Sequence, residues 1–355
     1  MSRVLALAAA FALLAAPAAG GRSLPPGAKP TKTQRPTSSG ATSWAAREIR
    51  VVVARGLMAK SVATFRPNDP LTQGELSALV AGLTDQPLQR AANPAAPVAM
   101  AQLDARLVRA LGVSAAATSF RAGAADAGLT VPTRFGTEVA ARLLGLRTNH
   151  PAKLDDLELR PTDPATRAEA AYSAAQILRF RGWEVNSLTS AADSFVLPQP
   201  SPWQKRVLNV ATRFIGFPYV WGGTSEGPGT TLGTPTRGGF DCSGFAWRVY
   251  KLQAYPGGAA LAQTLRGRTT YAMSGEVPRS KRVPFAKLRP GDLLFFGARG
   301  PRSKPAEVDH MGLYLGNRWL IHSSSYGVAV AQLRGWYRER FAWGRRPLAE
   351  AGLTS

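Results

Sequence analysis

The spacing of apolar and polar positions separates a helical first half of the chain from a mixed second half. Residues 44–183 alternate Ala- and Leu-rich stretches of helical period with short polar loops. Residues 203–214 repeat their apolar positions as an amphipathic helix does, and a further helical face begins at Ser243. The pattern predicts an all-α domain followed by an α+β domain.

The second half also contains two β-like patterns. Pro290-Gly291-Asp292 marks a turn, and the apolar run after it predicts a buried strand. Residues 311–321 have the pattern of a hairpin, with Gly316-Asn317 as its turn. A three-residue loop at 315–317 would place His310 opposite His322 on one face of the sheet. A two-residue loop would instead put the two rings on opposite faces.

Composition predicts linkers between these segments. Residues 21–43 are rich in Pro, Gly, Ser, Thr and Lys and lack an apolar period. Residues 184–202 hold Pro, Ser and Asn with few periodic apolar positions. We therefore expect a disordered linker at 21–43, a helical domain at 44–183, a second linker at 184–202 and a second domain at 203–347.

The N-terminus predicts export. Residues 1–20 begin with a short basic segment, continue with an apolar run from Val4 to Ala16 and end on small residues, as secretory signal peptides do. The run is shorter than the roughly 20 residues that a membrane helix needs. An uncleaved anchor is the alternative. Both place the rest of the chain outside the cytoplasm, and we expect it to be secreted or at the cell wall.

The charge balance predicts an affinity for polyanions. The chain has 44 Lys and Arg against 22 Asp and Glu, a formal net charge of +22. For an exported protein we expect anionic wall polymers or lipid head groups as partners, and no nucleic acid. A solvated surface without a specific partner is the alternative, because the Arg residues are spread along the chain.

A pattern recurs in the helical half: a helix, Gly-Leu, a loop, Pro-x-Asp-Pro, Thr, and a second helix with Glu in its first turn. The two clear copies contain Pro67-Asn68-Asp69-Pro70 with Thr72 and Glu75, and Pro161-Thr162-Asp163-Pro164 with Thr166 and Glu169. Thr followed by Glu three residues later predicts a capping box. A third copy with a weaker pattern is expected at about 98–135. Each unit is too small to bury its own face, so the copies should pack together.

This pattern resembles the S-layer homology domain, whose three repeats bind cell-wall polymers, over about 44–183. The segment Ala165-Thr166-Arg167-Ala168-Glu169 is similar to the wall-binding loop of that family, whereas Leu71-Thr72-Gln73-Gly74-Glu75 lacks its Arg. The resemblance implies a module that holds the protein at the wall. A purely structural helical domain is the alternative.

The second half contains the single cysteine of the chain, Cys242. Asp241 is a favourable N-cap, so Cys242 falls in the first turn of the predicted helix. There the helix dipole and the unpaired N–H groups favour a thiolate and could help to stabilise an oxyanion. A lone cysteine accompanied by histidines is a candidate nucleophile, and a buried, inert cysteine is the alternative.

The three histidines differ in their candidacy as the base. His150 lies in a surface-loop sequence of the helical half, and we expect no catalytic role for it. If the rings of the other two are neighbours, His310 accepts the thiol proton and later protonates the leaving amine. His322 then holds the tautomer and orientation of His310 through a hydrogen bond. Two ordinary polar residues at strand ends are the alternative.

The order of motifs in the second half resembles the NlpC/p60 family over about 203–347. The matching segments are Pro218–Gly223, Phe240–Phe245, Leu288–Phe296, Asp309–Gly312 and Ile321–Ser323. The resemblance implies a papain-like α+β fold and a cell-wall cysteine peptidase, with Cys242, His310 and His322 as catalytic residues. It implies neither a metal nor another cofactor.

The same resemblance suggests substrate contacts. It places Tyr219 near the substrate and matches Asp241 and Ser243 to residues that hold a substrate amine in some members. The segment between Trp221 and Phe240 is longer than the corresponding loops of the family. We expect this insert to narrow or cover the cleft.

Together these patterns predict a secreted peptidase that hydrolyses stem peptides of peptidoglycan and is held at the wall by its helical repeats. One alternative is a wall-binding protein with an inactive peptidase domain, against which the set Cys242, His310 and His322 speaks. The other is an amidase or acyltransferase on the same fold, which would use the same nucleophile and base.

Overall fold

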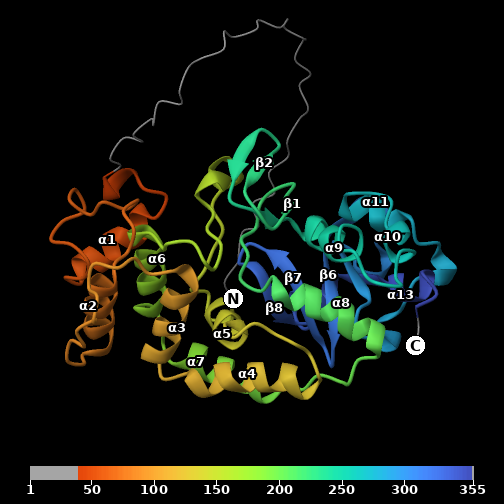
Figure 1. Cartoon of the computed structure of the whole chain (residues 1–355), viewed down its shortest axis with the longest axis horizontal. Helices are drawn as coiled ribbons and strands as arrows, with labels where there is room; N and C mark the ends of the chain where they lie inside the picture. The colour runs from red at the N-terminus through yellow and green to blue at the C-terminus, as the bar shows by residue number, and fades with distance from the viewer. Residues whose placement is uncertain (1–38, 354–355) are drawn as a thin grey trace, which may run out of the picture. The chain divides into compact units, whose positions relative to one another are not determined.

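The computed structural model describes residues 39–353. The predicted signal peptide at 1–20 lies outside the described residues, as does most of the 21–43 linker. The first part of the described chain is helical (Figure 1). Its helices are α1 (Ala46–Ala54), α2 (Gln73–Thr84), α3 (Met100–Ala110), α4 (Ser114–Asp126), α5 (Phe135–Leu143), α6 (Arg167–Ile177) and α7 (Trp183–Asp193). None of the helices within 39–353 is long and apolar enough to cross a membrane.

The second part combines helices with a five-stranded antiparallel sheet in the order β8-β7-β6-β5-β9. The sheet strands are β5 (Leu293–Gly297), β6 (Val308–Gly316), β7 (Trp319–Ser324), β8 (Gly327–Gln332) and β9 (Phe341–Arg345). The helices are α8 (Pro202–Arg213), α9 (Cys242–Tyr250), α10 (Leu261–Thr264), α11 (Thr270–Gly275), α12 (Trp336–Arg340) and α13 (Pro347–Glu350). Four short strands form the insert: β1 (Thr224–Ser225), β2 (Gly229–Thr231), β3 (Thr234–Thr236) and β4 (Gly239–Phe240). The predicted α+β class is confirmed.

The helical repeats close into a ring of backbone hydrogen bonds, as their small size predicts. The Leu71 N–H donates to the Ala165 carbonyl at 2.8 Å, Ala165 donates to Val98 at 2.8 Å, and Val98 donates back to Leu71 at 2.9 Å. Each of these residues directly precedes the N-terminal end of a second helix, namely α2, α6 or α3. Three copies therefore surround one centre, including the copy whose sequence pattern is the weakest.

The copies also satisfy one another's helix ends, whose first N–H groups have no partner within a helix. Gln73 and Gly74 of α2 donate to the carbonyls of Ala96 and Pro94. Met100 and Ala101 of α3 donate to Asp163 and Pro161, and Arg167 and Ala168 of α6 donate to Asp69 and Pro67. The Pro-containing loop of each copy thus caps a helix of another copy. The middle loop, Pro94-Ala95-Ala96-Pro97, preserves the two prolines and lacks the Asp.

The two predicted capping boxes differ. At Thr72 the box is complete, because the hydroxyl accepts from the Glu75 N–H and the Glu75 carboxylate accepts from the Thr72 N–H at 2.9 Å. At Thr166 the hydroxyl accepts from the Glu169 N–H at 3.3 Å. The Glu169 carboxylate instead bonds Arg147 and lies 3.2 Å from His150. Buried cations compete successfully for this carboxylate, so half of the second box is lost.

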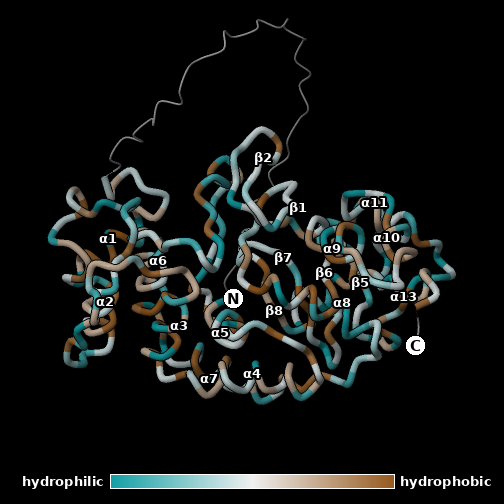
Figure 2. The backbone as a smooth tube through the Cα atoms, viewed as in Figure 1, coloured by the Kyte–Doolittle hydropathy of each residue, from teal (hydrophilic) through white to brown (hydrophobic). Residues whose placement is uncertain are grey.

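The sheet buries both faces. One face packs against α9 and the large core that continues into the helical part, whereas Leu294, Phe296, Tyr314, Leu320 and Phe341 form a smaller core on the other face. Apolar segments follow the sheet strands, whereas the β2–β3 hairpin is mostly pale (Figure 2). The sequence pattern after Asp292 correctly predicted the buried strand β5.

The predicted register of the β6–β7 hairpin is wrong by two residues. Leu313 pairs with Ile321 and Tyr314 with Leu320, so His322 lies opposite Gly312 and diagonal to His310. The turn has two residues, Asn317 and Arg318, both with positive φ, and this length alone would separate the rings. A register shift between Tyr314 and Gly316 accommodates one additional residue. Together, the turn and the additional residue shift the pairing by two residues from the predicted register. Side chains alternate along a strand, so an even shift leaves both histidines on one face of the sheet.

The segment 184–202 differs from the predicted linker. Its first part belongs to α7, where Leu188, Ala191 and Ala192 are buried at helical spacing. The Phe195 ring then packs against the Trp319 ring of β7, with 4.9 Å between centroids. The small Ala side chains give a weak apolar period, which explains why the sequence pattern missed this helix. The described helical and α+β parts therefore share one core.

The ring of repeats depends on Arg167, which joins the last copy in the chain, that of Thr166, to the first. Its guanidinium is buried, bonds the carbonyls of Phe65 and Met58 at 2.9 and 2.7 Å, and pairs with Glu75. We expect Arg167→Met to lower the free energy of unfolding by about 3 kcal/mol, because it leaves buried acceptors without a donor.

Denaturant unfolding monitored by circular dichroism measures this loss. Arg179→Ala is the matched control, since its guanidinium is more exposed and lies 3.7 Å from Glu48. It should change the stability by less than about 0.5 kcal/mol. Equal effects of the two substitutions would contradict a structural role for Arg167.

Candidate active site

The candidate nucleophile lies where the sequence predicts, in the first turn of α9. Asp241 is the N-cap, and its carboxylate accepts from the Gly244 N–H, from the Ser243 hydroxyl at 3.0 Å and from the Gly222 N–H at 2.9 Å. Cys242 is only 8% exposed. The cap therefore ties the start of the helix to the Gly222-Gly223 segment.

That segment requires glycine because two stretches of backbone meet there. A Cβ atom on Gly223 would lie 2.5 Å from the Gly239 carbonyl oxygen, and one on Gly244 would lie 1.8 Å from the Gly223 oxygen. Phe240 and Val220 bond across the same place, with Val220 N–H donating to Phe240 at 3.3 Å. This close approach of the backbone brings Tyr219 to the side of α9.

The two candidate histidines are in direct contact. His310 Nε2 lies 2.8 Å from His322 Nδ1, and the ring planes are 83° apart. His310 is half-buried and His322 is fully buried. Since Nε2 of His310 is occupied by this contact, Nδ1 is the nitrogen that remains for proton exchange.

Aromatic side chains that the sequence analysis did not single out enclose this pair. The Phe296 ring stacks on His310 with 5.8 Å between centroids, and the Tyr337 ring meets His322 edge-on at 5.2 Å. The Tyr337 hydroxyl lies 3.3 Å from His322 Nε2. The Trp336 ring lies 6.2 Å from His310. Both α12 residues lack a local sequence signal, because their role depends on how α12 folds back over the sheet.

The sulfur of Cys242 lies near the backbone of strand β6, at the residue that follows His310. Pairing of β6 with β7 ends at Leu313–Ile321, and the Met311 N–H reaches the sulfur together with the N–H groups of Cys242 and Ser243. Met311 directly follows His310. The structure thus brings the thiol to the base-bearing end of β6, at the head of a helix.

The N–H groups at the start of α9 favour a thiolate, as the sequence predicts, but burial outweighs them. Burial, followed by the nearby Asp241 carboxylate, raises the pKa of Cys242 to about 12, and the three N–H groups only partly offset these effects. Burial likewise lowers the pKa of His310 to about 4 and that of His322 well below its usual value. The thiol and both imidazoles are therefore neutral at pH 7.

A cleft of about 340 Å³ opens over Cys242. It is lined by Tyr219, Trp221, Gly222, Leu232, Asp241, Cys242, Ser243, Arg268, Thr269, Thr270, Tyr271 and Asp309. Leu232 is at the tip of the β2–β3 hairpin, is 76% exposed and lies over Gly222. The insert therefore narrows the cleft, and its apolar tip joins Trp221 and Tyr271 at the rim.

Arg268 is a cleft residue that sequence reasoning missed. It donates to the Ser243 hydroxyl at 2.7 Å, to both Asp241 oxygens at 3.2 Å and to the Gly222 carbonyl at 2.9 Å. Asp241 and Ser243 thus already share a cation, and a substrate amine would have to compete with it. Arg268 is 27 residues from Asp241, and no local pattern indicates that they meet.

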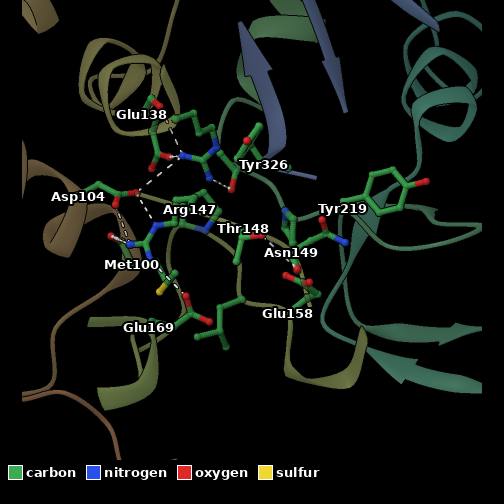
Figure 3. Close-up of a pocket in the computed structure, with 16 residues that line it drawn as sticks. Met100, Asp104, Glu138, Arg147, Thr148, Asn149, Glu158, Glu169, Tyr219 and Tyr326 are labelled. Atoms are coloured by element: carbon green, nitrogen blue, oxygen red, sulfur yellow. Dashed lines mark hydrogen bonds and ion pairs between the residues drawn. The ribbon is translucent and has the colours of Figure 1, made fainter. Parts of the chain in front are cut away.

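A second cavity lies between the helical part and the strand loops, and it is lined by buried charges. Asp104, Glu138, Arg147 and Glu169 point toward one another there, whereas the Tyr219 ring points away (Figure 3). Arg142 of this cluster pairs with Glu138 and donates to the Gly216 carbonyl at 3.0 Å. The hydrogen bond from Arg142 to Gly216 joins the helical part to the segment that carries Tyr219.

His150 belongs to the same buried cluster, so its predicted surface position is wrong. Its ring nitrogens lie 3.1 Å from Glu158 and 3.2 Å from Glu169. Burial alone would lower the pKa of His150, but the two carboxylates prevail and raise it to about 10. His150 is therefore a buried cation that pairs with two carboxylates of the helical part.

The raised pKa of Cys242 predicts its reactivity. Iodoacetamide should alkylate the native protein more slowly than a free thiol at pH 8. The rate should still rise at pH 10, because the thiolate fraction grows until the pH passes the pKa. In denaturant the same thiol should reach its plateau near pH 9 to 10, since its pKa returns to about 8.5.

Mass spectrometry reports this reaction without ambiguity because the chain has one cysteine. A native alkylation rate that is already constant below pH 7 would contradict a neutral thiol and indicate a thiolate–imidazolium pair.

Comparison with known proteins matches both parts of the chain. The model of the NlpC/P60 family matches residues 216–346, and that of the S-layer homology domain matches residues 38–77. A probable peptidoglycan endopeptidase LytE of Bacillus subtilis is 33% identical over 142 residues, which are 40% of this chain and 34% of the relative. A γ-D-glutamyl-L-lysine dipeptidyl-peptidase of the same species is 28% identical over 139 residues, 39% of this chain and 38% of the relative.

The chain thus spans little more than a third of the length of these relatives. A crystal structure of an NlpC/P60 family protein from Bacillus cereus is 28% identical, with a TM-score of 0.32, and covers 42% of this chain and 41% of its own. The two sequence matches show that the chain contains an NlpC/P60 domain at residues 216–346, preceded by an S-layer homology domain at residues 38–77.

Proposed function

We propose that this protein is a cysteine peptidase that hydrolyses peptide bonds in the stem peptides of peptidoglycan. Cys242 is the nucleophile, His310 the general base and acid, and His322 the residue that orients His310. The observation that carries the proposal is the 2.8 Å contact between His310 Nε2 and His322 Nδ1, which leaves Nδ1 of His310 available. The residue after His310, Met311, has its N–H near the Cys242 sulfur at the head of α9.

The neutral resting state is compatible with general-base attack. As the Cys242 sulfur adds to the scissile carbonyl carbon, its proton moves to His310 Nδ1, and the oxygen becomes an oxyanion. Backbone N–H groups at the start of α9 are suited to stabilise that charge. The imidazolium then protonates the departing amine, and a thioester remains on Cys242.

A water molecule completes the cycle. His310 accepts one water proton while the hydroxide adds to the thioester carbonyl. When the tetrahedral intermediate collapses, the carboxylic acid leaves and the sulfur recovers a proton from His310. The second step follows the first in reverse, with water in place of the amine, so one imidazole can transfer the proton in both steps.

The proposed substrate follows from the cleft and from the names of the relatives. One relative is named a probable peptidoglycan endopeptidase and another a γ-D-glutamyl-L-lysine dipeptidyl-peptidase, so both names denote cleavage of peptide bonds. In this chain Tyr219, Asp241 and Ser243 line the cleft beside Cys242 and are the proposed substrate contacts. An amidase or acyltransferase would need a different acceptor or leaving group at the same thioester.

Replacement of the nucleophile tests the reaction. We expect Cys242→Ala to reduce the release of peptide fragments from purified peptidoglycan to background, because no thioester can form. Its thermal unfolding should stay close to that of the unsubstituted protein. Mass spectrometry of the soluble fragments measures release and identifies the cleaved bond.

Ser173→Ala is the matched control, because it removes a small buried polar group from α6, which does not line the cleft. This variant should retain activity. Continued release by a folded Cys242→Ala protein would sink the nucleophile assignment. Absence of release by the unsubstituted protein would favour the wall-binding alternative.

We further propose that the helical repeats hold the enzyme at the cell surface. The S-layer homology match and the net charge of +22 support an anionic wall polymer as the partner. Arg167 belongs to the segment that resembles the wall-binding loop, but its side chain is buried in contacts between copies. A groove between α2 and α3 instead presents Arg106 and Arg109.

Sedimentation with purified walls tests this anchoring. The full-length Cys242→Ala protein should sediment with walls at low salt, and less so as salt screens the charges. Arg106→Ala combined with Arg109→Ala should weaken binding several-fold. Arg279→Ala with Lys281→Ala removes the same charge from another surface and should have a smaller effect. Equal effects would contradict the groove, and a protein that stays in solution at low salt would contradict anchoring.

A further inference from the structure

The imidazole pair is part of a longer chain of polar contacts. Tyr337 Oη lies 3.3 Å from His322 Nε2, and His322 Nδ1 lies 2.8 Å from His310 Nε2. Each contact joins one nitrogen, so every ring nitrogen in the pair is engaged except Nδ1 of His310. The 3.3 Å contact is long, as hydrogen bonds of active sites without substrate often are.

The direction of the protons along this chain decides whether His310 can act as a base. A neutral imidazole carries one N–H. If His322 Nδ1–H donates to His310 Nε2, then His310 must carry its proton on Nδ1, where it cannot accept another. If His310 Nε2–H donates to His322 Nδ1, then Nδ1 of His310 has a free lone pair. In that productive arrangement His322 carries its own proton on Nε2, which needs an acceptor.

Tyr337 is placed to be that acceptor. Its side chain also lines an open groove with Trp183 and Trp336, so its hydroxyl hydrogen can turn to solvent while its oxygen faces His322. Burial raises the pKa of Tyr337 to about 12, and the group therefore stays a neutral hydroxyl. The edge-on contact with the His322 ring keeps the oxygen near Nε2.

We propose that Tyr337 is a positioning residue: its oxygen accepts a hydrogen bond from His322 Nε2–H and thereby holds both imidazoles in the Nε2–H tautomer, with Nδ1 of His310 open toward Cys242. The catalytic consequence rests on the proposed function. The tautomer itself does not, because it is a property of the free protein.

Nitrogen-15 NMR of the full-length protein labelled at histidine tests the tautomer directly, since the chain has three histidines. Single His→Gln variants assign the signals. We expect Nε2–H forms for His310 and His322 in the unsubstituted protein, and mixed or reversed tautomers in Tyr337→Phe. A wild-type His322 protonated on Nδ1, or a Tyr337→Phe spectrum unchanged from the wild type, would overturn the proposal.

Kinetics with wall peptides supplies the second readout. Tyr337→Phe should lower kcat about fivefold to tenfold, the effect of one lost hydrogen bond, and leave KM within about twofold. Tyr255→Phe is the matched control: it removes a hydroxyl bonded to the Val249 carbonyl at 2.9 Å, away from the histidines. It should change neither kcat nor the spectrum.

The two readouts separate the two proposals. A tautomer shift in Tyr337→Phe without any peptidase activity in the parent protein would support the positioning role and contradict the proposed reaction. Activity in the parent that Tyr337→Phe lowers no more than Tyr255→Phe would contradict the positioning role alone.

Discussion

The proposed chemistry depends on the pairing register of the β6–β7 hairpin, which decides whether His310 and His322 lie on the same face of the sheet. Side chains alternate between the faces of a strand, so a one-residue slip between β6 and β7 would place His310 and His322 on opposite sides of the sheet. The two-residue turn and the additional residue in β6 together give an even displacement. The turn is held from outside: Asn317 donates to the Val196 carbonyl at 2.7 Å, and Trp319 donates to that of Ser194 at 3.1 Å. A segment between the two parts of the chain thus helps to fix the register on which the imidazole pair depends.

Local features of this site were predictable from the sequence, and long-range ones were not. The N-cap at Asp241, the position of Cys242 and the helix after it follow from neighbouring residues. Arg268 and Tyr337 reach the site through loops that no pattern relates to it. The net rise in the pKa of the thiol was not predictable for the same reason, since helix position is local but burial depends on the whole fold. The register prediction kept the correct face through two errors that cancelled.

The helical half illustrates how repeats tolerate sequence divergence. The middle copy lacks the Asp and the Thr of the other two, yet its loop carbonyls and helix amides occupy equivalent places in the ring. Backbone hydrogen bonds hold the copies together, so side chains are free to change as long as the prolines and the helix start remain. Arg167 shows the opposite case, because a side chain that resembles a binding residue is used to join two copies.

The core that passes from Phe120 and Phe195 to Trp319 has a consequence for how such a protein can be modified. An anchor on a free tether can be exchanged for another by recombination at the tether. Here a cut near residue 194 would expose aromatic rings on both sides and release the hairpin turn from its supports. Any replacement for the repeats must therefore bring a complementary apolar surface, and the two halves are expected to be inherited together rather than shuffled as modules.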